Sequence, residues 1–242
     1  MFKRTKAKRV KETMEKSTNL ESQFWDKHWL FQHSEGLLSL QYNPIISYLD
    51  STADGIKKKE DEIQESYRVW KEQHAGTHDP HDAYDLFESD LYDHAKFGEL
   101  LNSSTLVTIY SMFESNYYHV CQNLKLFLGS KIDVNDLRSD SNIGQCRVYI
   151  TKVGSVDLSS LDNHWNHIKK YQYIRNRVVH DNSRIIDIKS DMESFIKNSD
   201  GVEYMPKSKT VKIRSIEFLK KFIEVSRNYL VGVNNEIIKQ TG

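Results

Sequence analysis

The sequence contains few residues that interrupt helices. Its 242 residues include three prolines and ten glycines, and the apolar residues between them recur mostly at helical rather than alternating spacing. We therefore predict an all-α protein with a small β-hairpin before the last helix. The predicted helices span residues 6–33, 44–74, 81–97, 99–129, 140–153, 157–180, 188–198 and 214–240.

The chain also lacks a net charge and a long apolar run. Its 34 Lys and Arg balance its 34 Asp and Glu, so any attraction for a polyanion must be local. No segment approaches the ~18 continuous apolar residues of a membrane helix, and the N-terminus lacks the apolar stretch of a signal peptide. We expect a cytoplasmic protein with no membrane partner. The first 16 residues carry seven Lys and Arg against two Glu, which indicates either a solvated helix start or a basic arm on nucleic acid.

The cysteines and histidines show no convincing metal-ligand spacing, and we expect no cofactor. Cys121 and Cys146 lie in segments with helical periodicity, which favours two buried thiols. Residues 74–82 include three histidines and two aspartates, but a solvated loop with a helix start near Asp79 and Pro80 is the preferred interpretation over a metal site.

Residues 100–128 form the most apolar stretch, and we predict that they form the central core helix. Its expected core residues are Leu106, Ile109, Phe113, Val120, Leu124 and Phe127. The only acidic residue between Thr105 and Cys121 is Glu114. Its side chain lies either at the helix edge or inward beside a donor, for which Arg175 is the candidate.

The segment 173–182 contains the most informative motif, in which Arg175, Asn176 and His180 end an amphipathic helix. A histidine can transfer protons near neutral pH, and an arginine can bind phosphate, so these residue types could cleave RNA without a metal. On an ideal helix Asn176 and His180 lie within about 40° of each other, whereas Arg175 and His180 are about 140° apart. A site that uses both therefore needs the helix to end or distort near Val179, or needs a second copy.

One face of the same helix is apolar at its start and becomes polar near its end. Leu158, Leu161, Trp165 and Ile168 continue by helical spacing to Gln172, Arg175 and Val179. Arg175 could therefore also form a structural ion pair at the edge of the core. After the motif, two β-prone runs, 202–205 and 210–213, predict a hairpin around a polar turn. The last helix should pack on residues 100–128.

The order of these elements and the Arg-Asn-x-x-x-His motif resemble the HEPN superfamily over residues 99–240. Glu114 is a looser match to a polar position on the earlier helix. Residues 1–98 match no known pattern, and we interpret them as an N-terminal helical extension. Toxin branches with a cognate nucleotidyltransferase tend to carry a tyrosine two residues after the histidine, where this chain has Asn182, so the chain looks less like that branch.

The resemblance implies an all-α domain, an up-and-down helical bundle of HEPN type that is commonly a homodimer. It also implies a metal-independent endoribonuclease site of Arg175, Asn176 and His180, supported by Glu114 and Arg177. It further implies an RNA substrate, a role as a prokaryotic toxin or abortive-infection and anti-phage defence effector, and a possible inhibitor, antitoxin or sensor protein as partner. Cleavage would proceed by attack of the ribose 2′-hydroxyl on the adjacent phosphate.

Three alternatives concern the function and the assembly. The first is a non-catalytic module of the same superfamily that binds protein or RNA. The second is a metal hydrolase on Asp162, His164 and His167, which has no evident third ligand at metal spacing. The third concerns the residues Tyr171, Tyr173 and Ile174, which belong either to a dimer interface or to the core of their own chain.

Overall fold

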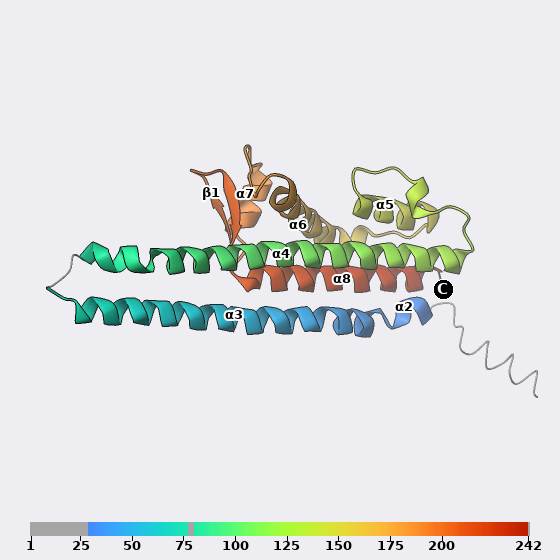
Figure 1. The fold of residues 1–242 in the computed structure, drawn as a ribbon. Helices are drawn as coiled ribbons and strands as arrows, with labels where there is room; N and C mark the ends of the chain where they lie inside the picture. Colours follow the sequence, from blue (N-terminus) through green and yellow to red (C-terminus); the bar gives the residue numbers. More distant parts are fainter. Residues whose placement is uncertain (1–28, 77–79, 242) are drawn as a thin grey trace, which may run out of the picture. The chain divides into compact units, whose positions relative to one another are not determined.

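The computed structural model describes residues 29–76 and 80–241 (Figure 1). The predicted basic arm and most of the first predicted helix lie outside these ranges. The helices are α2 (Trp29–Gln32), α3 (Ser34–Gln73), α4 (Pro80–Leu128), α5 (Asn142–Val148), α6 (Asp162–His180), α7 (Ser190–Lys197) and α8 (Ile216–Thr241). Shorter turns are η1 (Val134–Asp136), η2 (Tyr149–Val153) and η3 (Ser159–Leu161).

The prediction of a mostly helical chain with one hairpin before the last helix is confirmed. Strands β1 (Val202–Met205) and β2 (Thr210–Ile213) pair antiparallel in the predicted positions. The register joins Val202 to Ile213 and Met205 to Thr210. Val202, Val211 and Ile213 are buried, so the hairpin has one face in the core.

Two predicted helix boundaries are wrong. Helix α4 continues through Gly98, where we predicted a break between two helices. An added Cβ at Gly98 would meet nothing within 4 Å, and a single glycine weakens a helix by only about 1 kcal/mol relative to alanine. Helix α3 begins at Ser34 and contains Pro44. The proline leaves the carbonyl of Leu40 without its helical donor, but Leu40 is exposed, so water can replace that donor.

The described residues belong to two compact units, to both of which α4 and α8 contribute. The larger unit comprises Leu37–Asn116 and Ser160–Tyr229. Within it, α3 and the first part of α4 run side by side in opposite directions, with Tyr67 and Phe87 in ring contact at 6.0 Å (Figure 1). From Asp50 to the end of α3 only Ile63 is buried, so this part of the helix is exposed on most sides.

Aromatic side chains form the core of the larger unit. Tyr110 of α4 and Phe222 of α8 lie with ring centroids 6.4 Å apart, which confirms the predicted packing of the last helix on residues 100–128. Tyr171 of α6 stacks on Phe222 at 4.4 Å, and Phe195 of α7 lies 5.4 Å from Tyr171. Five of the six expected core residues of α4 are buried, and Phe127 is half-buried.

The smaller unit comprises, among the described residues, 29–36, Tyr117–Ser159 and 230–241. Cys121 and Cys146 are buried free thiols, as predicted. The Cys121 Sγ lies 3.6 Å from the Cys146 carbonyl oxygen. Interaction with the Cys146 side chain, together with burial, raises the pKa of the Cys121 thiol. Asp133 forms an ion pair with Lys125 at 2.6 Å and caps η1.

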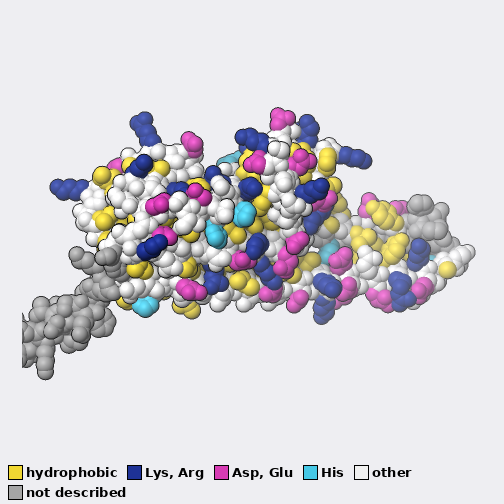
Figure 2. All heavy atoms as spheres, turned by 180° about the vertical axis from the view of Figure 1, so that it is seen from behind, with side chains coloured by type: hydrophobic (Ala, Val, Ile, Leu, Met, Phe, Trp, Pro, Cys, Tyr) yellow, Lys and Arg dark blue, Asp and Glu magenta, His cyan; other side chains and the backbone are white. Residues whose placement is uncertain are grey.

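The neutral composition is visible on the molecular surface. On the face shown in Figure 2, lysine and arginine side chains alternate with aspartate and glutamate. No single charge sign dominates this face, so any region with one charge sign is local to an individual helix or strand.

Candidate functional site

Helix α6 carries the motif, and its buried face differs from the predicted stripe. Ile168, Tyr171 and Ile174 are at most 2% exposed, whereas Gln172 and Arg175 are half-buried and Val179 is exposed. The core line therefore follows residues 168, 171 and 174. Because Tyr171 and Ile174 are buried within their own chain, they cannot form the dimer interface considered above. Tyr173 is half-buried.

Arg175 lies against the side chain of a buried tyrosine. Its Cζ is 5.1 Å from the ring centroid of Tyr110 on α4, within the range of a cation–π interaction. Its Nη1 donates a hydrogen bond to Asn176 Oδ1 at 3.1 Å. Its Nε is buried and has no hydrogen-bond partner among the described residues.

Glu114 is half-buried one helical turn after Tyr110. No ion pair joins Glu114 to Arg175 within the described part of the chain. The prediction that Arg175 could be the partner of Glu114 is therefore wrong. The guanidinium of Arg175 packs on the ring of Tyr110 instead.

His180 is the last residue of α6, and its side chain is exposed. The helix therefore does not end before the histidine, and on its own it does not remove the angular separation from Arg175. Asn176 lies four residues earlier, on the face of α6 that carries His180. The Arg175–Asn176 hydrogen bond is consequently the link between the arginine and the histidine side of the helix.

Arg177 lies apart from Arg175, on the outer side of α6. Its Cζ lies 5.0 Å from the ring centroid of Tyr173, and its Nη1 forms an ion pair with Asp181 at 2.6 Å. Its Nε is also buried and without a partner in the described ranges. The two arginines of the motif thus stack on two tyrosines that belong to different elements.

The predicted end of this helix at residue 180 is confirmed. Asn182 and Ser183 adopt left-handed φ values of 49° and 64°, and the Ser183 N–H donates to the Arg177 carbonyl at 2.8 Å. Asparagine tolerates this conformation better than most residues, because its short side chain can bond locally. The chain therefore turns sharply after His180.

The loop after the turn pairs with strand β2. The Val211 N–H donates to the Ser183 carbonyl at 2.9 Å, and the Ile185 N–H donates to the Lys209 carbonyl at 2.7 Å. This pairing brings Arg184 and Lys209, both exposed, to the end of the motif helix. These two residues are not part of the site predicted from the sequence. Nothing in the local spacing indicates a pairing between segments more than twenty residues apart.

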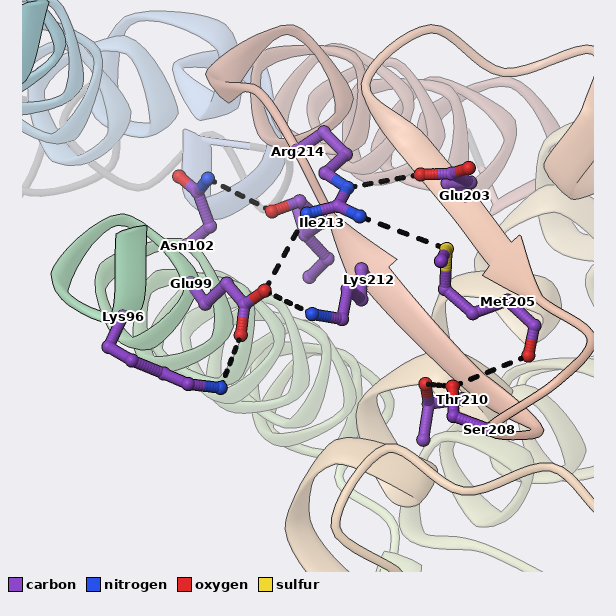
Figure 3. A network of polar contacts seen from close by, with 10 residues as sticks. All are labelled: Lys96, Glu99, Asn102, Glu203, Met205, Ser208, Thr210, Lys212, Ile213 and Arg214. Carbon is purple, nitrogen blue, oxygen red and sulfur yellow. Dashed lines mark hydrogen bonds and ion pairs between the residues drawn. The ribbon is translucent and has the colours of Figure 1, made fainter. Parts of the chain in front are cut away.

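A polar network attaches the hairpin to α4 (Figure 3). Glu99 pairs with Lys96 at 3.2 Å, with Arg214 at 3.6 Å and with Lys212, and Arg214 also pairs with Glu203 at 3.1 Å. Burial favours the neutral form of Glu99, but hydrogen bonds from Lys212 and Lys96 outweigh burial and lower the pKa of its carboxyl. The hairpin, and with it the loop after His180, is thus fixed to the core helix.

The hairpin is also held by a buried amide. Asn102 of α4, which is 7% exposed, donates to the Ile213 carbonyl at 3.1 Å. A cavity of about 530 Å³ lies beside this attachment, and Val178, Val179 and Asn182 of the motif segment line it. The motif therefore ends next to a hollow, but His180 does not line it.

The residues considered for metal binding do not come together. No group of three or more metal-ligating side chains occurs among the described residues, although part of the 74–82 interval lies outside them. His164 is half-buried and its Nδ1 has no partner in the described chain. Although His167 is exposed as a residue, partial desolvation of its imidazole, together with the charge of Lys170, lowers its pKa.

Comparison with known proteins yields no relative. No protein-family model matches the chain, and neither a curated protein nor a solved structure matches it. Within the described residues, no helix combines the length and the apolar character needed to cross a membrane.

Proposed function

We propose that the chain is a metal-independent endoribonuclease of the HEPN type. The observation that carries the proposal is the hydrogen bond from Arg175 Nη1 to Asn176 Oδ1 at 3.1 Å. Asn176 and His180 are four residues apart on α6, so this bond directs the guanidinium toward the side of the helix that carries the histidine. Side chains thereby bridge part of the separation of about 140° on an ideal helix.

The proposed reaction is attack of a ribose 2′-oxygen on the adjacent phosphorus. The hydroxyl proton passes to a base, the bond to the 5′-oxygen breaks, and that oxygen takes a proton from an acid. The products are a 2′,3′-cyclic phosphate and a 5′-hydroxyl. His180 performs one of the two proton transfers. Arg175 stabilises the negative charge on the phosphate oxygens, and Asn176 orients His180 or the substrate.

A second proton-transfer group is needed, and a homodimer would supply it as the second copy's His180. Mixing Arg175→Ala protein with His180→Ala protein should then restore part of the activity through heterodimers. Light scattering that shows only monomer at every concentration at which RNA is cleaved would exclude this assembly.

The direct test is cleavage of single-stranded RNA in the presence of EDTA. We expect cleavage by wild type and at least a hundredfold loss in His180→Ala, the order of a lost general acid or base. His119→Ala is the matched control, because His119 is an exposed histidine outside the motif, and it should cleave like wild type. Absence of cleavage by wild type, or equal cleavage by His180→Ala, would overturn the proposal.

In cells, we propose that the protein acts as a prokaryotic toxin or as an abortive-infection and anti-phage effector. A ribonuclease that attacks cellular RNA must be restrained, so an inhibitor, antitoxin or sensor protein is the expected partner. Expression of wild type beside His180→Ala, with total RNA examined for cleavage, tests this role. Equal growth and intact RNA in both cultures would count against it.

The second candidate is a non-catalytic module that binds protein or RNA. The observation that favours it is the packing of Arg175 on Tyr110, a residue that is 2% exposed. An arginine packed in this way could have a purely structural role. In that case alanine substitutions at Arg175, Asn176 and His180 should lower the melting temperature, and no cleavage should be found.

A further inference from the structure

One face of α6 presents a continuous line of polar and aromatic side chains. Asn166, Lys169, Tyr173, Arg177 and His180 follow one another at intervals of three or four residues, the spacing of neighbours on a helix surface. Asn166, Lys169 and His180 are exposed, and Tyr173 and Arg177 are half-buried. This outer line lies opposite the buried residues of the helix.

The outer line is locally positive in a chain that is neutral overall. From Asn163 to His180 the sequence contains four Lys and Arg and no Asp or Glu. By contrast, residues 82–93 of α4 contain five acidic residues and no Lys or Arg. Lys169 forms no ion pair with any described residue. The acidic residues at the two ends of the line are Asp162 and Asp181, and Asp181 is already paired with Arg177.

The middle of the outer line holds two planar groups in contact. The Arg177 guanidinium lies 5.0 Å from the ring centroid of Tyr173. Tyrosine rings and guanidinium planes are the groups on which proteins stack the bases of single-stranded RNA. The contact with Arg177 also restricts the Tyr173 ring, so less side-chain entropy is lost when a base packs against it.

We propose that this outer line is a binding track for single-stranded RNA, along which the strand extends from His180 toward Asn166. Tyr173 stacks a base, and Lys169 contacts a backbone phosphate. From Lys169 to His180 the track covers twelve residues of helix, which rise by about 16 Å. The inference rests on the proposed ribonuclease function and adds how the substrate is held beside the reacting phosphate.

Because Lys169 forms no ion pair with a described residue, the part of the track from Asn166 to Tyr173 favours an anion over a second copy of the same face; only His180, at the end of the line, would face the second copy of the proposed homodimer. Two copies of the outer line in contact would bring Lys169 of both chains into the interface, and the line has no free acidic residue to compensate it, because Asp181 is already paired with Arg177. Charged residues are depleted at the cores of protein interfaces. An RNA strand instead offers one phosphate for each nucleotide, and each contact releases counterions.

The test measures binding without cleavage. The probe is a short, fluorescein-labelled, single-stranded 2′-O-methyl oligoribonucleotide of mixed sequence, which lacks the attacking hydroxyl. Fluorescence anisotropy should show Tyr173→Leu binding about tenfold more weakly than wild type, because a stacked base contributes roughly that factor or more. Tyr173→Phe should bind like wild type. Lys169→Ala should reduce the slope of log K against log salt by about 0.7, the value for one phosphate contact on a single strand.

Two matched variants control for general effects. Tyr92→Leu removes an exposed tyrosine on acidic α4 that also has a lysine over its ring, at 5.6 Å. Lys57→Ala removes an exposed helical lysine of α3. Both should bind the probe like wild type. Circular dichroism melts should show that all variants are folded.

The outcomes separate this inference from the proposed function. If wild type cleaves RNA but Tyr173→Leu and Lys169→Ala bind the probe like wild type, the track is wrong and the ribonuclease stands. If wild type does not cleave RNA while both variants lose binding, the track is supported as the surface of a non-catalytic RNA-binding module. If the same substitutions change the oligomeric state in light scattering, the outer line is a protein interface and the track is wrong.

Discussion

Replacement of Arg175 by methionine should separate catalysis from stability. The arginine contributes a cation–π contact with Tyr110 and a hydrogen bond to Asn176. These are worth about 1 kcal/mol each. The Nε of Arg175 is buried and has no hydrogen-bond partner among the described residues. This unsatisfied donor lowers the stability by about 1–3 kcal/mol. The favourable and unfavourable contributions nearly cancel.

Methionine fills much of the same space and can pack its sulfur on the Tyr110 ring, a favourable contact of about 1 kcal/mol. The free energy of unfolding should therefore change by no more than about 1 kcal/mol in either direction, which corresponds to about 2–4 °C in Tm for a chain of this size. Cleavage should fall by about 10²–10³, because the charge at the phosphate is lost.

Urea unfolding and RNA cleavage would be measured on the same preparations. Arg138→Met is the control, since Arg138 is exposed and outside the motif, and it should change neither quantity. A fall of about 3 kcal/mol or more in the unfolding free energy of Arg175→Met, with cleavage absent from wild type as well, would refute the catalytic role of the arginine. That result would identify it as a structural residue whose removal leaves a buried group unpaired.

Further predictions concern backbone conformation and acid stability. Gly98→Ala should raise the unfolding free energy by up to about 1 kcal/mol, because Gly98 is helical with open space at its Cβ position. Gly129→Ala should lower it by a similar amount, about 1–2 kcal/mol, because Gly129 has φ +61°; equal effects at both sites in urea unfolding would contradict this. The hydrogen bond from Lys125 lowers the pKa of Asp133 to about 2. The ionised Asp133 carboxylate therefore stabilises the fold fully above about pH 3.9, the pKa of an aspartate in the unfolded chain. This stabilisation is lost as the pH falls through about 2. Asp133→Asn should flatten the pH dependence of unfolding in that window, and an unchanged dependence would show that other groups govern it.

The predictable part of the fold is the part that periodicity determines. The hairpin, the last helix and the core residues of α4 follow from the spacing of apolar residues, and the structure has them where expected. The break predicted at Gly98 failed because a glycine lowers helix propensity without preventing helix formation. The start predicted at Pro44 failed for a related reason, since an exposed carbonyl left by a proline can be hydrated.

The motif residues could be recognised from the sequence, but their surroundings could not. The helix stop after His180 has a local signal in Asp181-Asn182-Ser183. The stacking of Arg175 on Tyr110 joins two helices that are far apart in the sequence, and no local rule selects a ring over the carboxylate of Glu114. The same holds for Arg184 and Lys209, whose proximity to the motif depends on backbone pairing with β2.

That pairing has a consequence for the motion of the motif helix. The last turn of a helix usually frays, since its final carbonyls have no helical donors. Here the chain that follows α6 is bonded to β2, and β2 is bonded through its side chains to α4. The end of α6 should therefore open only together with the hairpin, so the amides of Ser183, Ile185 and Val211 should exchange their hydrogens at similar, slow rates.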